Sequence, residues 1–165
     1  RSPITFIKKK ILRKKNTTFT IPQGGLPRFL WKIAHDTSFF PSRGTDTLKK
    51  LVETDRIEAY LISGRFGYLE DHLNAWLNRH KMKSYFTKIN INKNDEQPHK
   101  FKERIIKKLN LDAYIEDNWD IVEHLSNVVP ETKVYWVTNI VDRYIHYSRK
   151  YNSLEEILEN IIASF

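Results

Sequence analysis

From residue 45 onward the chain alternates between compact apolar runs and stripes of apolar residues with helical spacing. The compact runs predict short buried strands, and they cover residues 57–62, 85–91, 113–115 and 134–137. Between and around them, apolar residues recur every three or four positions, which predicts helices near residues 45–52, 69–80, 101–109, 119–125 and 154–162. Ser153 and Glu156 have the spacing of a capping box at the start of the last helix.

Strands and helices that alternate in this way predict an α/β fold with a Rossmann-like parallel sheet covered by helices on both faces. The strands are apolar on both sides, as expected for strands buried between two helix layers. In such sheets ligands bind beyond the carboxyl ends of the strands. Polar residues that follow each strand are therefore the candidates for a functional site.

Composition excludes several classes of site. The 165 residues include no cysteine, which excludes disulfides, thiolate metal centres and thiol catalysis and fits a reducing compartment such as the cytoplasm. Five glycines do not form a phosphate loop or a dinucleotide fingerprint. The six histidines lack the spacing of a zinc site, and no apolar run is long enough to predict a transmembrane segment.

Positive charge is concentrated near the start of the chain. Residues 1–35 hold nine basic residues and no acidic one, whereas residues 36–165 hold 19 basic and 20 acidic residues. This basic segment is interpreted as a solvated surface element or as a site for an anionic partner. Such a partner would be a phosphate-rich molecule such as nucleic acid, or an anionic membrane surface.

Three groups of polar residues near the expected strand ends could carry chemistry. Ser63, Gly64 and Arg65 follow the first strand, where a hydroxyl, backbone N–H groups and a guanidinium can hold a phosphoryl group or form an ordinary turn. Lys102 lies at the start of a helix, where a cation is unfavourable unless it faces an anion.

The third group comprises Glu116 and Asp117, adjacent acids at the end of the third strand. Such a pair can bind Mg²⁺, which accepts one or two carboxylates together with waters and phosphate oxygens. The alternative is that Asp117 or Asn118 caps the following helix. By contrast, residues 90–98 are interpreted as a plain polar loop.

In this order, the three groups resemble motifs two to four of the haloacid dehalogenase (HAD) superfamily. LISGR at residues 61–65 resembles the motif that supplies a Ser or Thr. PHKFKERI at 98–105 resembles the lysine motif, and AYIEDN at 113–118 resembles the acidic motif. The resemblance covers residues 45–139. It implies a Rossmann-like sheet and a Mg²⁺-dependent phosphatase that acts on a phosphorylated small molecule or another phosphate-bearing substrate through an aspartyl-phosphate intermediate.

The resemblance also implies roles for individual residues. Ser63 and Lys102 would be catalytic, Ser63 by binding a phosphoryl oxygen and Lys102 by offsetting negative charge. Gly64 and Arg65 would contact substrate. The acidic pair, Glu116 and Asp117, would hold Mg²⁺.

The family's first motif, the Asp-x-Asp strand that supplies the nucleophile, does not occur before Ser63. Because the chain begins at Arg1 and not at Met, we expect this strand to precede Arg1, which would leave the chain as given inactive. Residues 1–44 would then be a basic flap or small cap, and residues 45–165 the HAD-like core. The alternatives are an inactive HAD-like binding or scaffold protein, and an α/β domain that binds nucleic acid or anionic membranes through its basic segment.

Overall fold

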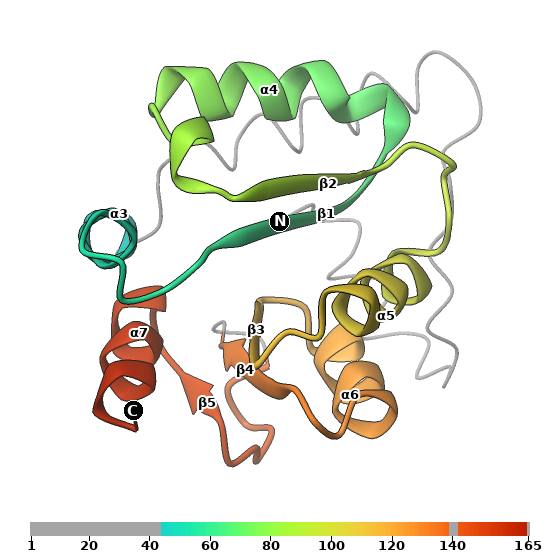
Figure 1. Cartoon of the computed structure of the whole chain (residues 1–165). Helices are drawn as coiled ribbons and strands as arrows, with labels where there is room; N and C mark the ends of the chain where they lie inside the picture. The colour runs from blue at the N-terminus through green and yellow to red at the C-terminus, as the bar shows by residue number, and fades with distance from the viewer. Residues whose placement is uncertain (1–43, 139–141, 165) are drawn as a thin grey trace.

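The computed structural model describes residues 44–138 and 142–164 (Figure 1). The basic segment at residues 1–35, nearly all of the expected flap, and Asn139 lie outside the described residues. The described elements are α3 (Thr45–Glu53), β1 (Tyr60–Phe66), η1 (Gly67–Leu69), α4 (Glu70–Arg79), η2 (Lys83–Tyr85), β2 (Lys88–Asn92), α5 (Pro98–Leu109), β3 (Ala113–Glu116), α6 (Trp119–Val128), β4 (Lys133–Val137), β5 (Lys150–Tyr151) and α7 (Leu154–Ala163).

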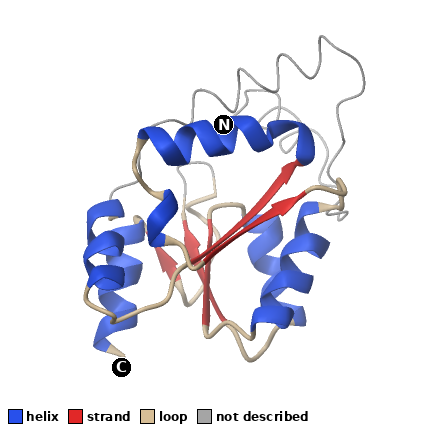
Figure 2. Ribbon diagram, turned by 45° about the horizontal axis from the view of Figure 1, so that its top comes forward, coloured by secondary structure: helices blue, strands red, loops and turns tan. Residues whose placement is uncertain are grey.

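The strands form two small parallel sheets. One contains β1 and β2, and the other contains β3, β4 and β5 in that order. Helices lie on more than one side of the strands (Figure 2). The expected α/β class with parallel strands is therefore confirmed, while β1 and β3 are not bonded to each other within the described residues.

The first two strands differ from the ranges predicted by hydropathy. β1 begins at Tyr60 and continues through Phe66, and its register with β2 shifts between Ser63 and Phe66. β2 begins only at Lys88, because residues 83–85 form a 3₁₀ turn. Ser63 consequently lies inside an irregular strand and not in a turn after it.

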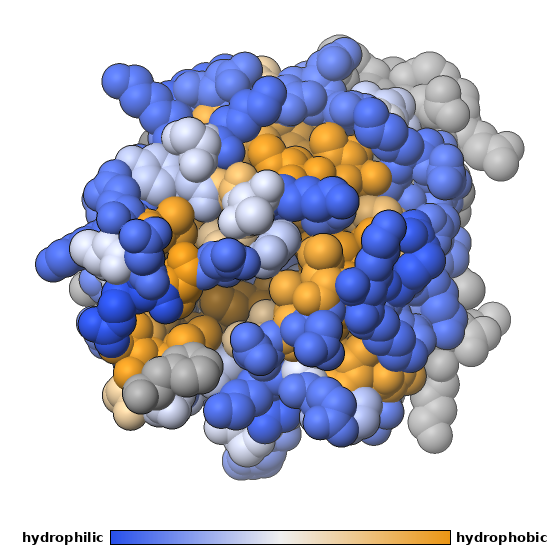
Figure 3. All heavy atoms as spheres, viewed as in Figure 1, coloured by the Kyte–Doolittle hydropathy of each residue, from blue (hydrophilic) through white to orange (hydrophobic). Residues whose placement is uncertain are grey.

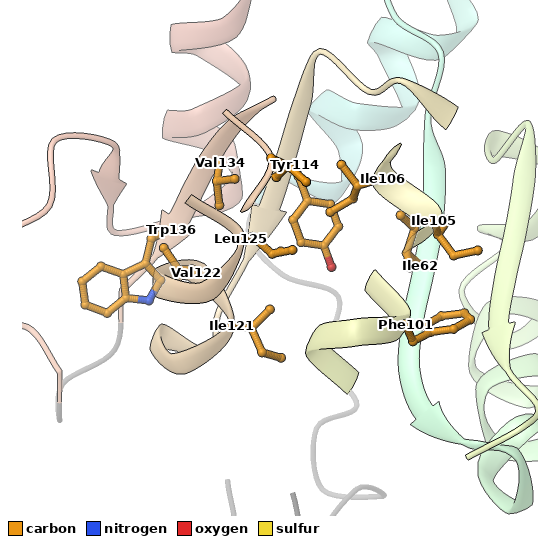
Figure 4. Packing of buried hydrophobic residues seen from close by; sticks show 11 residues of the cluster. Ile62, Phe101, Ile105, Ile106, Tyr114, Ile121, Val122, Leu125, Val134 and Trp136 are labelled. Carbon is orange, nitrogen blue, oxygen red and sulfur yellow. The ribbon is translucent and has the colours of Figure 1, made fainter. Parts of the chain in front are cut away.

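A shared core joins the two sheets. Ile62 of β1 belongs to the same buried cluster as Tyr114 of β3 and Val134 and Trp136 of β4 (Figure 4). Helix α5 packs against β1, α6 packs against β4, and the two helices pack against each other. Val122 and Leu125 of α6 are completely buried. Burial of this apolar surface is the main stabilising contribution to the arrangement.

Local sequence signals fix the ends of two helices. The Ser153 hydroxyl accepts a hydrogen bond from Glu156 N at 3.2 Å, which confirms the expected cap of α7. Asn118 Oδ1 accepts one from Asp120 N at 3.0 Å and caps α6. Within the described residues, no helix is long and apolar enough to cross a membrane.

Glu103 links α5 to α6 and predicts a pH dependence of stability. Its carboxylate accepts hydrogen bonds from Lys107 and His124, both at 2.8 Å. The hydrogen bond from Lys107 lowers the pKa of Glu103 from 4.5 to about 2, burial opposes this shift, and His124 and Lys100 add to it. A carboxyl group whose pKa is lower when folded contributes stability above its unfolded pKa, and loses it as the pH falls through the folded pKa.

We therefore expect the free energy of unfolding to fall between about pH 4.5 and pH 2, and to fall less steeply in Glu103→Gln. Urea unfolding over this pH range measures the effect. Glu123→Gln, which changes an exposed residue of α6, is the matched control. Equal pH slopes in the two variants would contradict the assignment to Glu103.

Candidate functional site

The site begins where β1 meets the first turns of α5. A Cβ atom placed on Gly64 would lie 3.0 Å from Pro98 Cβ and 3.1 Å from Lys102 Cε. These distances are tighter than ordinary van der Waals contact, so the absence of a side chain at Gly64 allows the lysine to pass against the strand. The structure thus brings together the segment of Ser63 and Gly64 and the lysine of α5, two of the three groups that the sequence singled out.

The third group meets the same lysine. Lys102 Nζ donates to Glu116 Oε2 at 2.5 Å, and the two residues are only 9% and 6% exposed. Proline at the first turn of α5 and apolar residues on its inner face direct Lys102 toward the core. A buried charge pair of this kind is energetically costly unless further hydrogen bonds satisfy it.

Two more donors complete the environment of Glu116. Tyr114 Oη donates to Oε2 at 3.1 Å, and Asn118 N donates to Oε1 at 3.2 Å. Burial raises the pKa of Glu116, and the neighbouring Lys102 opposes this by favouring the charged form. Burial also raises the pKa of Tyr114 well above its usual value, so its hydroxyl remains a donor.

These contacts separate the roles of the two adjacent acids. Both oxygens of Glu116 are engaged by protein donors, whereas Asp117 is exposed. Of the two, Asp117 is the carboxylate accessible to a cation. Within residues 44–138 and 142–164, no group of three or more acidic or histidine side chains is arranged to hold a metal ion, so any Mg²⁺ here would also need ligands from elsewhere.

Ser63 and Arg65 flank Gly64 on β1. Ser63 is buried, and its hydroxyl accepts a hydrogen bond from Arg65 N at 3.4 Å. Arg65 is half-buried. The serine hydroxyl therefore lies in the irregular part of the strand, where the ladder with β2 shifts register.

A pocket of about 550 Å³ opens between β1, β3 and the start of α7. In the view of Figure 3, a hollow over this region has hydrophobic residues inside it and both hydrophobic and hydrophilic residues around it. The lining is apolar along the strands and becomes polar at Lys102, Glu116 and Asp117. The lining residues are Ile62, Lys102, Tyr114, Ile115, Glu116, Asp117, Val137, Asn152, Ser153 and Leu154.

Two parts of this site were missed by sequence reasoning. Tyr114 was assigned only to the apolar strand, although alternation along β3 places Tyr114 and Glu116 on the same face. That periodicity was the available signal. The approach of residues 152–154 to the pocket depends on how α7 packs, for which the sequence offers no comparable signal.

The polar residues predicted as a loop over 90–98 are partly in regular structure, because Asn90 and Asn92 belong to β2 and Pro98 begins α5. Asn92 is fully buried, donates to Glu96 O at 2.7 Å and accepts from Glu96 N at 2.9 Å. Asp95 accepts a hydrogen bond from Gly67 N at 2.8 Å and ties the loop to the end of β1. These side chains hold the chain that leads into α5, and hence the position of Lys102.

Comparisons with protein-family models, with curated proteins and with solved structures each found no match.

Proposed function

We propose that this chain is the core of a Mg²⁺-dependent phosphohydrolase of the HAD type, acting on a phosphate-bearing substrate. The proposal rests on one observation. Strand β1, helix α5 and strand β3 meet at one point. There Gly64 lies against Lys102, and Lys102 is hydrogen-bonded to Glu116. This is the constellation that the resemblance to HAD motifs two, three and four requires.

Each side chain of the constellation has a role in phosphoryl transfer, which depends mainly on positioning and charge stabilisation. The Ser63 hydroxyl and nearby N–H groups would bind a phosphoryl oxygen. Arg65 would contact the substrate, and Lys102 would offset the negative charge of phosphate and nucleophile. Glu116 would hold Lys102 in place, which leaves Asp117 as the ligand for Mg²⁺.

The arrangement of the two sheets supports a further strand between them. Within the described residues, β1 is paired only with β2, and β3 only with β4. Ile62 of β1 and Ile115 of β3 line the pocket that separates the two strands. An apolar strand bonded to both free edges would unite the two sheets into one Rossmann-like sheet, and its carboxyl end would carry the Asp-x-Asp nucleophile toward Lys102.

The chemistry then follows in two balanced steps. A carboxylate oxygen of the supplied aspartate forms a bond to phosphorus while the bond to the leaving alcohol oxygen breaks. Water then attacks the acyl phosphate, releasing inorganic phosphate and regenerating the carboxylate. Bound Mg²⁺ would supply charge neutralisation to the transferred phosphoryl group.

Binding of Mg²⁺ and inorganic phosphate by the chain as it stands tests the site without requiring turnover. We expect weak binding, detected as shifts of the backbone amide signals of residues 116–118 in NMR titrations with MgCl₂. Asp117→Asn should remove these shifts, because it removes the accessible carboxylate. Asp120→Asn changes a nearby acid in the first turn of α6 and should retain them.

Shifts that are equally strong in both variants, or absent in the wild type, would contradict the metal role of Asp117.

A second measurement separates the enzyme from an inactive binding or scaffold protein of the same fold. A chain extended by the residues encoded upstream of Arg1 should hydrolyse p-nitrophenyl phosphate in the presence of Mg²⁺. If the upstream residues contain no Asp-x-Asp strand, the enzymatic proposal fails.

A further inference from the structure

Seven basic residues gather where α3 and α4 end and β2 begins, and we name this surface the basic edge. It lies at the amino ends of β1 and β2, whereas Ser63 and Lys102 lie toward the carboxyl end of β1 (Figure 1). Its members come from four separate stretches of chain. They are Lys49, Lys50, Arg56, Arg79, Lys81, Lys83 and Lys88.

Hydrogen bonds and strand pairing hold these stretches side by side. Lys49 Nζ donates to His80 O at 3.4 Å, joining α3 to the end of α4. Tyr85 Oη donates to Glu53 Oε1 at 2.6 Å, joining η2 to α3. The first residue of β2 lies opposite the first residue of β1 in the parallel register. The basic residues therefore form one surface and not a scatter along the sequence.

Local helix stability explains only part of this charge. Lys50 and Arg79 occupy the last turns of α3 and α4, where a cation favours the helix macrodipole. Arg56, Lys81 and Lys88 lie outside those helices. Since residues 36–165 carry a net charge of −1 in total, this accumulation is a local feature of the surface.

The basic edge is also poorly neutralised. Of the acidic residues near it in the sequence, Glu53 and Glu58 accept hydrogen bonds from tyrosine hydroxyls. Within the described parts of the chain, five exposed cations of the edge have no carboxylate within ion-pair distance. These are Lys50, Arg56, Lys81, Lys83 and Lys88.

The basic residues of α5 show the contrast. Lys100 and Lys107 pair with Glu103, and Arg104 pairs with Glu96. Their charge is balanced inside the protein, as is usual for a solvated helix face. Lys50, Arg56, Lys81, Lys83 and Lys88 of the basic edge have no such ion pair within the described residues.

Aromatic rings lie among these cations and indicate the class of partner. Lys49 Nζ lies 5.6 Å from the centre of the half-buried Tyr85 ring, and the Trp76 and His80 rings stand 4.7 Å apart. Surfaces that bind single strands combine phosphate-binding cations with rings on which bases stack. Tyr85 and Trp76 are half-buried, so part of each ring is exposed for such stacking.

We propose that the basic edge binds single-stranded nucleic acid, with its lysines on the phosphates and its rings against bases. This inference goes beyond the phosphohydrolase proposal and does not depend on it. The binding surface and the candidate site use different residues, so either can fail without the other.

Fluorescence anisotropy of the full chain with a labelled oligouridylate of about 20 nucleotides tests the proposal. Each phosphate contact to a single strand contributes about 0.7 to the slope of log affinity against log salt. We expect Lys83→Gln/Lys88→Gln to lower this slope by about 1.4 and to weaken binding about tenfold near 0.1 M salt. Lys93→Gln/Lys108→Gln makes the same charge change at two exposed lysines elsewhere and should bind like the wild type.

Far-UV circular dichroism of both double variants confirms that each is folded before binding is compared. Three outcomes would overturn the proposal. The first is a wild-type chain that does not bind the oligonucleotide. The second is an equal loss of affinity in the two double variants, which would assign binding to overall charge. The third is an unchanged affinity in Lys83→Gln/Lys88→Gln, which would assign it to residues outside the edge, such as the basic segment at 1–35.

Discussion

Replacing Lys102 with methionine is expected to lower the free energy of unfolding by about 3–5 kcal/mol, the usual cost of breaking a buried ion pair from one side. Methionine retains most of the apolar stem but removes the ammonium that donates to Glu116 Oε2. Glu116, 6% exposed, would be left with Tyr114 and a backbone N–H as donors. Urea unfolding followed by far-UV circular dichroism measures the loss.

The double variant Lys102→Met/Glu116→Gln is the informative control. It removes both charges and keeps a carbonyl oxygen that accepts from Tyr114 or the Asn118 N–H, so most of the lost stability should return. If the single variant were as stable as the wild type, Lys102 would not be needed to stabilise the buried Glu116 carboxylate. A double variant no more stable than the single one would mean that the loss comes from packing and not from an unpaired charge.

The same energetics bear on why the pair exists. Replacing a buried ion pair by apolar groups of similar volume is often neutral or stabilising, so stability alone gives little reason to bury Lys102 and Glu116. An ammonium held beside Gly64 in the lining of a pocket is consistent with the proposed binding of a phosphate anion. This argument supports the phosphohydrolase proposal independently of motif order.

The sequence predicted those elements that are determined by neighbouring residues in the chain. It did not predict those that depend on contacts between distant segments. The short strand at 113–116 and the cap formed by Ser153 follow from residues adjacent in the chain, and both were predicted to within a residue. The range of β1 was predicted wrongly because its start depends on pairing with β2, whose first residue, Lys88, lies opposite Tyr60. β5 has two residues that pair with β4, too few to give a hydropathy pattern.

The candidate site was predictable in its members but not in its connections. The order of Ser63, Lys102 and the acidic pair suggested that they would meet, because parallel strands end at a common edge. Hydropathy could not reveal that Glu116 accepts hydrogen bonds from three donors while Asp117 is exposed. That difference arises from alternation on β3 and from the packing of α5, which together put one carboxylate inside and the next outside.

Substitution of Trp136 is also expected to lower the free energy of unfolding strongly, because this residue packs beside β3, the strand that carries Glu116. It is completely buried on β4 and lies opposite Glu116 in the parallel register. The centres of its ring and the Trp119 ring are 4.8 Å apart. Trp136→Ala is expected to cost about 3–5 kcal/mol of unfolding free energy, the range for deleting a large buried aromatic side chain. Within the described residues, the indole Nε1 has no hydrogen-bond acceptor.

Trp136→Phe is therefore expected to cost much less, about 1–2 kcal/mol, because it removes an unsatisfied buried donor along with part of the ring volume. Urea unfolding of both variants, followed by circular dichroism at a wavelength independent of tryptophan, measures the difference. Similar losses in the two variants would mean that the indole N–H has an acceptor that stabilises the fold. A small loss in Trp136→Ala would mean that the core around β3 and β4 closes over the missing ring, and that the position of Glu116 does not depend on it.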